Sequence, residues 1–294
     1  MDTQPTDPLF DPAFAILAPP TQLWPILFTS PHSGRHYPPS FLSQSALDPQ
    51  TLRRSEDSYV DELFVGAPAK GAPLLQALFP RAYLDVNREQ YELDPAMFDG
   101  PLPDFVQRDS PRVIAGLGTI ARQVASGAEI YRHKLSFAEA ERRIETLYRP
   151  YHRALEQLVS ATLARFSRCL LLDCHSMPSI GGPDDSDSGF ERVDFVLGDC
   201  FGRSCAASLT DAVEQFLLEH GYRVVRNSPY AGGFTTRHYG NPAGAVHAMQ
   251  IEINRRLYMN ESNHRRHAGF ARLQKQMTQL IERLTTLSGS RGFP

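Results

Sequence analysis

Residues 170–178 read Leu-Leu-Leu-Asp-Cys-His-Ser-Met-Pro, and this stretch decides the fold class. An apolar run ends in Asp, His and Ser and is then stopped by proline, as in a buried strand of a parallel sheet. Ligands of open α/β sheets bind beside the carboxyl ends of such strands. A lone histidine at this place is most often a hydrogen-bonded core residue, so the segment by itself predicts a strand and no more.

A second segment repeats this design. Residues 26–34 read Ile-Leu-Phe-Thr-Ser-Pro-His-Ser-Gly, which is again an apolar run that breaks at a His-Ser pair. Two strands that both end in His-Ser indicate that His32 and His175 form a two-histidine metal site. The pair of segments therefore predicts a binding site that neither segment predicts alone.

The composition excludes several classes of function. The 294 residues are 41% hydrophobic, and 30 basic residues nearly balance 33 acidic ones, for a net charge of -3. Because no basic stripe is present, nucleic acid is not expected as a partner, and no apolar run is long enough for a membrane span. The amino terminus lacks the basic start and apolar centre of a signal peptide. Four cysteines without CxxC spacing then predict a reduced, cytoplasmic protein.

Strands that alternate with helices predict a layered α/β fold. Besides the two segments above, strands are expected at residues 73–78, 82–86, 194–197, 222–225 and 246–253, and helices at 56–71, from 136 to beyond 158, at 206–220 and at 262–287. The proline-rich residues 1–22 are expected to form an extended surface arm, and residues 23–294 a single domain. Residues 89–127 and 227–240 are expected to be loops, of which the first resembles a binding loop or lid.

Zinc sites that cleave amides use three protein ligands, often two histidines and a carboxylate, and keep a fourth position for water. His32 and His175 supply the imidazoles, and both Glu56 and Asp57 are candidates for the carboxylate. Glu252 stands out because it lies in a strand that is otherwise suited to burial, where an unpaired charge is costly. It is either the general base beside a bound water or the partner of Arg255 or Arg256 in a salt bridge.

Asn87 and Arg88 end another expected strand. An arginine can hold a carboxylate with two parallel hydrogen bonds, a geometry that lysine does not offer. The simpler alternative is that Arg88 is an exposed cation at a strand end.

Six segments together resemble the N-formylglutamate amidohydrolase (deformylase) family. They are residues 30–34 (Ser-Pro-His-Ser-Gly), 85–88 (Asp-Val-Asn-Arg), 148–152 (Tyr-Arg-Pro-Tyr-His), 173–176 (Asp-Cys-His-Ser), 233–240 (Gly-Phe-Thr-Thr-Arg-His-Tyr-Gly) and 250–252 (Gln-Ile-Glu), followed by Tyr258-Met259. The likeness extends from about Ile26 to Met259, most of the chain. Each segment alone is weak, but six in one order are specific.

The resemblance implies a fold, a cofactor and a substrate. The fold is a three-layer α/β/α arrangement with a mixed sheet, similar to the zinc carboxypeptidases. The cofactor is Zn²⁺. The reaction is the hydrolysis of a small N-acyl amino acid, first of all N-formyl-L-glutamate, to formate and L-glutamate, a step of histidine degradation. A related N-acyl amino acid with another acyl group or side chain is the alternative substrate.

The resemblance also implies a role for each site residue. Zinc is held by His32, a carboxylate and His175, and family members place an aspartate where Asp57 stands, which favours it over Glu56. The remaining roles are Glu252 as general base, Arg81 at the oxyanion, and Asn87 and Arg88 on the substrate carboxylate. Apart from the resemblance, Thr235, Thr236 and Arg237 are expected to contact a second carboxylate, because they lie in an expected loop.

Two other classes of function compete with this one. A cysteine hydrolase would use Cys174 or Cys169, but Cys174 and His175 point to opposite faces of a strand, so the cysteine would need another partner such as His238. A non-catalytic carboxylate-binding module would have no use for a buried base, and Glu252 argues against it.

Overall fold

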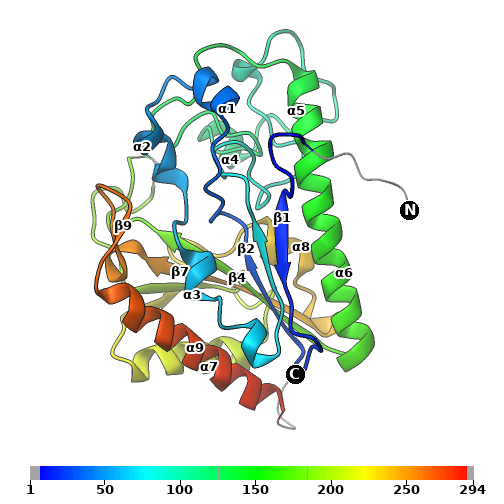
Figure 1. Ribbon diagram of the computed structural model, residues 1–294, viewed down its shortest axis with the longest axis vertical. Coiled ribbons are helices and arrows are strands. Elements are labelled where there is room, and N and C mark those ends of the chain that lie inside the picture. The colour runs from blue at the N-terminus through cyan, green and yellow to red at the C-terminus, as the bar shows by residue number, and fades with distance from the viewer. Residues whose placement is uncertain (1–6, 125, 184, 290–294) are drawn as a thin grey trace.

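The computed structural model describes residues 7–124, 126–183 and 185–289 of the chain, which form a twisted sheet between two layers of helices (Figure 1). Seven strands pair in the order β1-β3-β2-β4-β7-β5-β6. Their bounds are Phe14–Leu17 for β1, Ile26–Ser30 for β2, Leu74–Ala77 for β3, Cys169–Met177 for β4, Phe195–Gly198 for β5, Val224–Arg226 for β6 and Val246–Asn254 for β7. Strands β3, β2, β4 and β7 are parallel, whereas β1 and the β5–β6 pair run the opposite way. The expected mixed sheet is confirmed.

Each face of the sheet has its own apolar core. On one face, residues such as Leu27, Leu171 and Ala248 pack beneath α5 (Phe137–Arg143) and α6 (Arg149–Phe166). On the other face, Phe28 and Leu172 pack beneath α3 (Val60–Leu63), α7 (Ala207–Glu219) and α9 (Gly269–Ser288). Because alternate strand residues point to opposite faces and helices cover both, all nine residues of β4 are buried. The expected three-layer α/β/α architecture is confirmed.

The remaining helices are short and lie in the connections. They are α1 (Pro39–Gln44), α2 (Pro49–Leu52), α4 (Pro111–Ile114) and α8 (Phe234–Tyr239), and β8 (Met259–Asn260) pairs with β9 (Arg265–Arg266) in a small hairpin. None of the helices among the described residues is both long enough and apolar enough to cross a membrane.

The long helical segment after residue 136 begins as expected and runs on through Pro150. The Ser136 hydroxyl accepts a hydrogen bond from the backbone N–H of Glu139 at 3.2 Å and so caps α5. A π-helical turn, Ile144–Tyr148, joins α5 to α6 and places Pro150 in the first turn of α6. The N–H of Arg149 donates to the Ile144 carbonyl across this turn, so the helical hydrogen bonds continue from α5 into α6.

Three expected elements differ in the structure. Residues 14–17, expected within a surface arm, form β1 antiparallel to β3, and Phe10 is buried. Residues 82–86 form no strand, because the chain turns at Pro80, whose carbonyl accepts the N–H groups of Tyr83 and Leu84. The helix expected at residues 56–71 is confined to α3, since Tyr59 just before it has a left-handed backbone with φ of 68°.

Two expectations near the carboxyl end also change. The segment 227–240 is not wholly a loop, because residues 234–239 form α8. The last helix begins at Gly269 instead of 262, and the residues before it form the β8–β9 hairpin.

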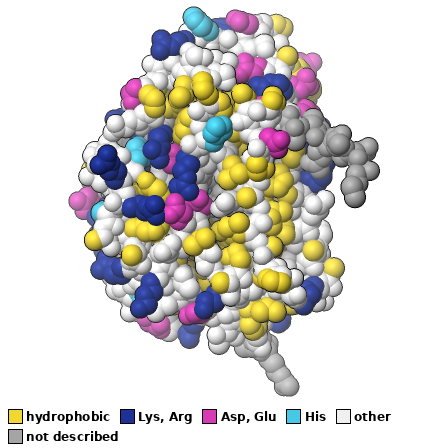
Figure 2. All heavy atoms as spheres, viewed as in Figure 1, with side chains coloured by type: hydrophobic (Ala, Val, Ile, Leu, Met, Phe, Trp, Pro, Cys, Tyr) yellow, Lys and Arg dark blue, Asp and Glu magenta, His cyan; other side chains and the backbone are white. Residues whose placement is uncertain are grey.

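Charged side chains of both signs mix on the face shown in Figure 2, over α3 and beside β9. Arg35 pairs with Asp61 and Glu62, and Arg266 pairs with Glu62. These exposed pairs each contribute little to stability, roughly 0–1 kcal/mol.

Candidate metal centre and active site

Two parallel strands bring His32 and His175 together. In the β2–β4 pair Thr29 lies opposite Asp173, so the residues just beyond β2 lie beside the carboxyl end of β4. The two Nδ1 atoms are 3.1 Å apart, and Oδ2 of Asp57 lies 3.4 Å from Nδ1 of His32 and 3.0 Å from Nδ1 of His175. All three side chains are buried. The two histidines therefore lie together, as the two similar strand ends predicted, and Asp57 adds a third potential metal ligand.

Each histidine is oriented by a further carboxylate. Nε2 of His32 lies 2.7 Å from Oδ1 of Asp85, and Nε2 of His175 lies 2.8 Å from Oδ2 of Asp173. A carboxylate can only accept, so each Nε2 carries the proton and each Nδ1 lone pair points toward the oxygen of Asp57. Aspartate residues that hold metal-ligating histidines in this way also raise their basicity.

This donor set fits a metal ion. Three acceptor atoms that face one another without a donor repel unless a positive charge lies among them. Tetrahedral zinc, with bonds of about 2.0–2.2 Å to nitrogen and oxygen, separates its ligands by about 3.3 Å, close to the 3.0–3.4 Å found here. Without a metal a proton must take this role. Burial lowers the pKa of His175, but Asp173 and Asp57 outweigh it and raise that pKa well above its usual value.

The structure separates Asp57 from its neighbour Glu56. Glu56 points away from the histidines and binds the Arg53 guanidinium through two contacts of 2.9 Å and the Ser58 hydroxyl at 2.7 Å. Asp57 is placed by its N–H, which donates to the His32 carbonyl, while Nη2 of Arg255 holds Oδ1 at 3.0 Å. Oδ2 is thus the oxygen left for a metal. Burial alone raises the pKa of Asp57, but the two histidines hold it well below its usual range.

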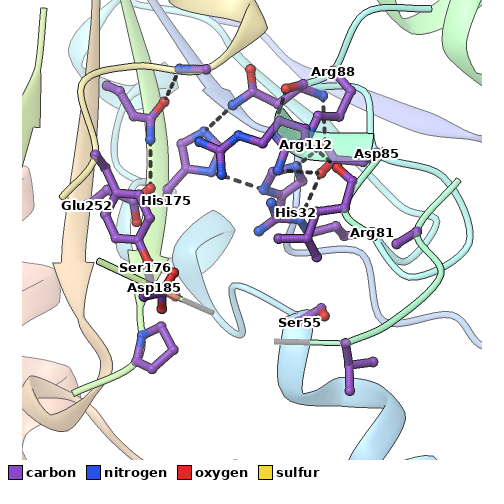
Figure 3. A pocket seen from close by; sticks show the side chains of 18 of the residues that line it. His32, Ser55, Arg81, Asp85, Arg88, Arg112, His175, Ser176, Asp185 and Glu252 are labelled. Atoms are coloured by element: carbon purple, nitrogen blue, oxygen red, sulfur yellow. Dashed lines mark hydrogen bonds and ion pairs between the residues drawn. The ribbon is translucent and has the colours of Figure 1, made fainter. Parts of the chain in front are cut away.

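Glu252 lies on β7 directly opposite His175 in the strand register and lines the same cavity (Figure 3). Nε2 of Gln250 donates to its Oε1 at 2.7 Å, and the N–H of Gly233 fixes Gln250 in turn. The salt bridge considered as an alternative is not formed, because Arg255 pairs with Asp57 and Arg256 with Asp194 and Glu191. Burial raises the pKa of Glu252 to about 7, a value suited to proton transfer near neutral pH.

Arg81 and Arg88 lie on the cavity wall and share one anion. Nε of Arg81 donates to Oδ2 of Asp85 at 2.9 Å, and Nη2 of Arg88 lies 3.6 Å from the same oxygen. Arg88 is buried and also donates to the carbonyls of Leu117 and Asn87, so it is not the exposed strand-end cation of the simpler alternative. Burial, with the nearby cations of Arg112 and Arg81, lowers its pKa to about 10 in spite of Asp85.

Asn87 lines the cavity, but its side-chain amide forms hydrogen bonds within the protein. Its Nδ2 donates to Oδ2 of Asp173 at 3.2 Å, and its Oδ1 accepts the N–H of Thr235 at 2.8 Å. Gly233 is required beside it, since a Cβ there would lie 2.3 Å from the Asn87 amide nitrogen. Asn87 thus links the arginine-bearing segment to β4 and α8.

The structure does not bring Thr235, Thr236 and Arg237 to the cavity. Thr235 and Thr236 are buried in α8, where the Thr236 hydroxyl donates to the Gly233 carbonyl at 3.0 Å. Arg237 is exposed and donates to the Gly232 carbonyl. Their expected contact with a second carboxylate has no support in this geometry, because residues 234–239 are helical and only residues 230–233 of this segment line the cavity.

Four further side chains of this site were not predicted from the sequence. Asp85 and Asp173 stand within the quoted motifs, and their period-two spacing from Asn87 and His175 was an available signal. Gln250 likewise lies two residues before Glu252 on the same strand face. Arg112 had no comparable signal, because only tertiary structure brings α4 to the cavity.

The cysteines offer no nucleophile to this cavity. Cys174 belongs to the core on the opposite face of the sheet from His175, and burial raises its pKa well above the usual value. Burial raises the pKa of Cys169 to about 12. A thiol that stays protonated is a poor nucleophile, so the cysteine-hydrolase alternative has no support in this geometry.

Comparison with known proteins shows where this chain belongs. The model of the family described as N-formylglutamate amidohydrolase matches residues 24–259. The chain belongs to this family. It is 29% identical over 243 residues to the N-formylglutamate deformylase of Pseudomonas putida and 30% identical over 240 residues to that of Pseudomonas aeruginosa. Each alignment covers 81% of this chain and 83% of the relative.

A solved structure supports the same assignment. The crystal structure of N-formylglutamate amidohydrolase from Ralstonia eutropha JMP134 has a TM-score of 0.86 to this chain at 39% identity, covering 94% of this chain and 98% of that one. The resemblance to the N-formylglutamate amidohydrolase family that the motifs indicated is therefore confirmed over nearly the whole chain.

Proposed function

We propose that this protein is a zinc-dependent amidohydrolase that converts N-formyl-L-glutamate and water to formate and L-glutamate. The observation that carries the proposal is the convergence of three buried ligand atoms, 3.0–3.4 Å apart, with Glu252 directly across the strand pair. The names of the relatives supply the substrate. The arginines of the cavity wall agree with an acidic substrate.

His32, Asp57 and His175 would hold the zinc ion, which supplies positive charge that polarises a carbonyl group and acidifies water. Glu252 accepts a proton from the attacking water, whose oxygen forms a bond to the formyl carbon. The carbon–nitrogen bond then breaks, Glu252 returns the proton to the leaving nitrogen, and formate and glutamate are the two products. A pKa of about 7 lets Glu252 act in both directions.

Arg81 and Arg88 would bind the substrate. The two Nη atoms of Arg81 have no hydrogen-bond partner within the described ranges, so they are available to the oxygen that becomes negative during attack. Arg88 would hold the α-carboxylate, and Asn87 would keep Arg88 in place. A cytoplasmic location remains part of the proposal and is based on four buried free cysteines.

Formate release and metal content test this proposal. The purified protein should contain about one zinc per chain, lose activity to a chelator and regain it with Zn²⁺. Replacing the α-carboxylate of N-formylglutamate by an amide should lower kcat/KM about 10- to 100-fold, since hydrogen bonds between charged groups are worth about 1.5–3 kcal/mol. Formate release that is indifferent to metal removal would refute the zinc-dependent mechanism. Equal rates for acid and amide would refute the role of Arg88.

A further inference from the structure

One arginine on the cavity wall is left without a partner by the protein. Arg81 and Arg88 both lie against Asp85, whereas Arg112 donates no hydrogen bond and forms no ion pair within the part of the chain that the structure describes. Its side chain is exposed at the cavity, and Figure 3 shows it near Arg88. Among the four arginines that line the cavity, Arg112 is thus the one that no carboxylate of the described residues neutralises.

The backbone beneath Arg112 is held firmly. The Ser110 hydroxyl accepts the N–H of Val113 at 3.1 Å and caps α4, and Val113 is buried. The carbonyl of Arg112 accepts the N–H of Leu117, whose own carbonyl accepts Nε of Arg88 at 2.7 Å. These two hydrogen bonds attach the Arg88 guanidinium to the turn whose backbone carries Arg112.

The charges around the cavity favour an anionic ligand with more than one carboxylate. Four arginines line it (Arg81, Arg88, Arg112 and Arg255) against three carboxylates (Asp85, Asp185 and Glu252). Arg255 is committed to Asp57 and Asp185 to Arg192. The cation of Arg112 repels that of Arg88 and so lowers the pKa of Arg88. A ligand carboxylate bound between the two arginines would reduce this repulsion.

We propose that Arg112 binds the side-chain carboxylate of the substrate and gives the enzyme its preference for acidic over neutral N-formyl amino acids. The inference rests on the proposed function and extends it, because it replaces the expected contact at residues 235–237 with a residue of the 89–127 segment. Arg112 is then a specificity-determining residue, and Arg88 is left for the α-carboxylate.

The test compares two substrates of nearly equal shape, N-formyl-L-glutamate and N-formyl-L-glutamine. Arg112→Gln should lower kcat/KM for the glutamate compound about tenfold or more and leave the glutamine compound within about twofold. The decrease in kcat/KM is expected to lie near tenfold, because the Arg112 side chain is exposed and water screens its charge. Arg112→Lys should be intermediate, since lysine keeps the charge but not the two parallel donors.

Arg132→Gln is the matched control, because it removes an exposed arginine of the neighbouring sequence that does not line the cavity. It should leave the ratio of the two rates unchanged. Raising the salt concentration should lower this ratio in the wild type and not in Arg112→Gln. A ratio that survives Arg112→Gln overturns the inference while leaving the hydrolase function intact.

Calorimetric binding of glutarate separates the two proposals. If no N-formyl amino acid is hydrolysed but glutarate binds the wild type at least about tenfold more tightly than Arg112→Gln, the function fails and the carboxylate site stands. Equal glutarate affinity in both proteins, together with an unchanged ratio of kcat/KM for the two substrates, shows that Arg112 binds no carboxylate.

Discussion

Replacing Glu252 by glutamine should abolish activity and stabilise the metal-free protein. The glutamine side chain keeps the size of the glutamate and can accept the same hydrogen bond from Gln250, but it cannot take up a proton at neutral pH. Loss of a general base typically lowers the rate by about 10²- to 10⁴-fold. The fold and the proposed metal ligands should be unaffected, since the hydrogen bond of the Glu252 side chain is to Gln250 and not to His32, Asp57 or His175.

The stability effect follows from burial of the carboxyl group. Its pKa is raised from 4.5 to about 7, so the folded state binds a proton more tightly than the unfolded state. The folded protein therefore loses stability as the pH rises through this window, and the loss amounts to about 3 kcal/mol above pH 7. Removing the ionisable group in Glu252→Gln should recover about that much at pH 8 and nothing below about pH 4.5.

The assay is urea unfolding of chelator-treated protein at pH 4.5 and pH 8, together with formate release by the zinc-loaded protein. Glu141→Gln, at an exposed position of α5, is the control and should change neither quantity. Turnover within a few-fold of the wild type would show that another group is the base. A variant that gains no stability at pH 8 would show that the buried carboxylate carries no such penalty.

Two further predictions concern the metal ligand and a buried histidine. Asp57→Ala should lose bound zinc and Glu56→Ala should retain it, because Asp57 faces the histidines and Glu56 binds Arg53. Elemental analysis measures the zinc content of both variants. Zinc lost from Glu56→Ala and kept in Asp57→Ala would make Glu56 the ligand. Burial lowers the pKa of His152 to about 4, so between pH 7 and pH 4 the unfolding free energy of the wild type should fall by about 3 kcal/mol relative to His152→Gln. A pH-independent difference between the two proteins would refute this linkage.

The sequence by itself determined the strands whose apolar residues show that they are buried. Strands β4 and β7 are both nine residues long, and their apolar residues allow only a central position with both faces covered. The two strand ends with His-Ser placed His32 and His175 correctly, because parallel neighbours present their carboxyl ends at one edge. Glu252 was found for a related reason, since a carboxylate in a buried strand must have a use or a partner.

The conformation of short segments was harder to predict where it depends on contacts with distant residues. The expected strand at residues 82–86 is apolar enough, but the turn at Pro80 and the cavity wall determine its course. Thr235 and Thr236 lie in a glycine-rich segment that reads as a loop, yet Asn87 accepts the N–H of Thr235 near the start of α8. Contacts of this kind join residues 148 positions apart. Propensity within a short window carries no information about them.

Only the tertiary structure decided how the site is completed. The choice between Asp57 and Glu56 depends on which carboxylate the turn directs at the histidines and which it directs at Arg53. Asp85 and Arg112 reach the cavity from segments that form neither a strand nor a long helix, so no strand or long-helix pattern indicates their position. Sequence pattern determines which residues must be buried or charged, whereas pairing between distant segments depends on register and packing. For this reason the meeting of His32 and His175 could be predicted from the sequence, whereas the way in which Arg112 reaches the cavity could not.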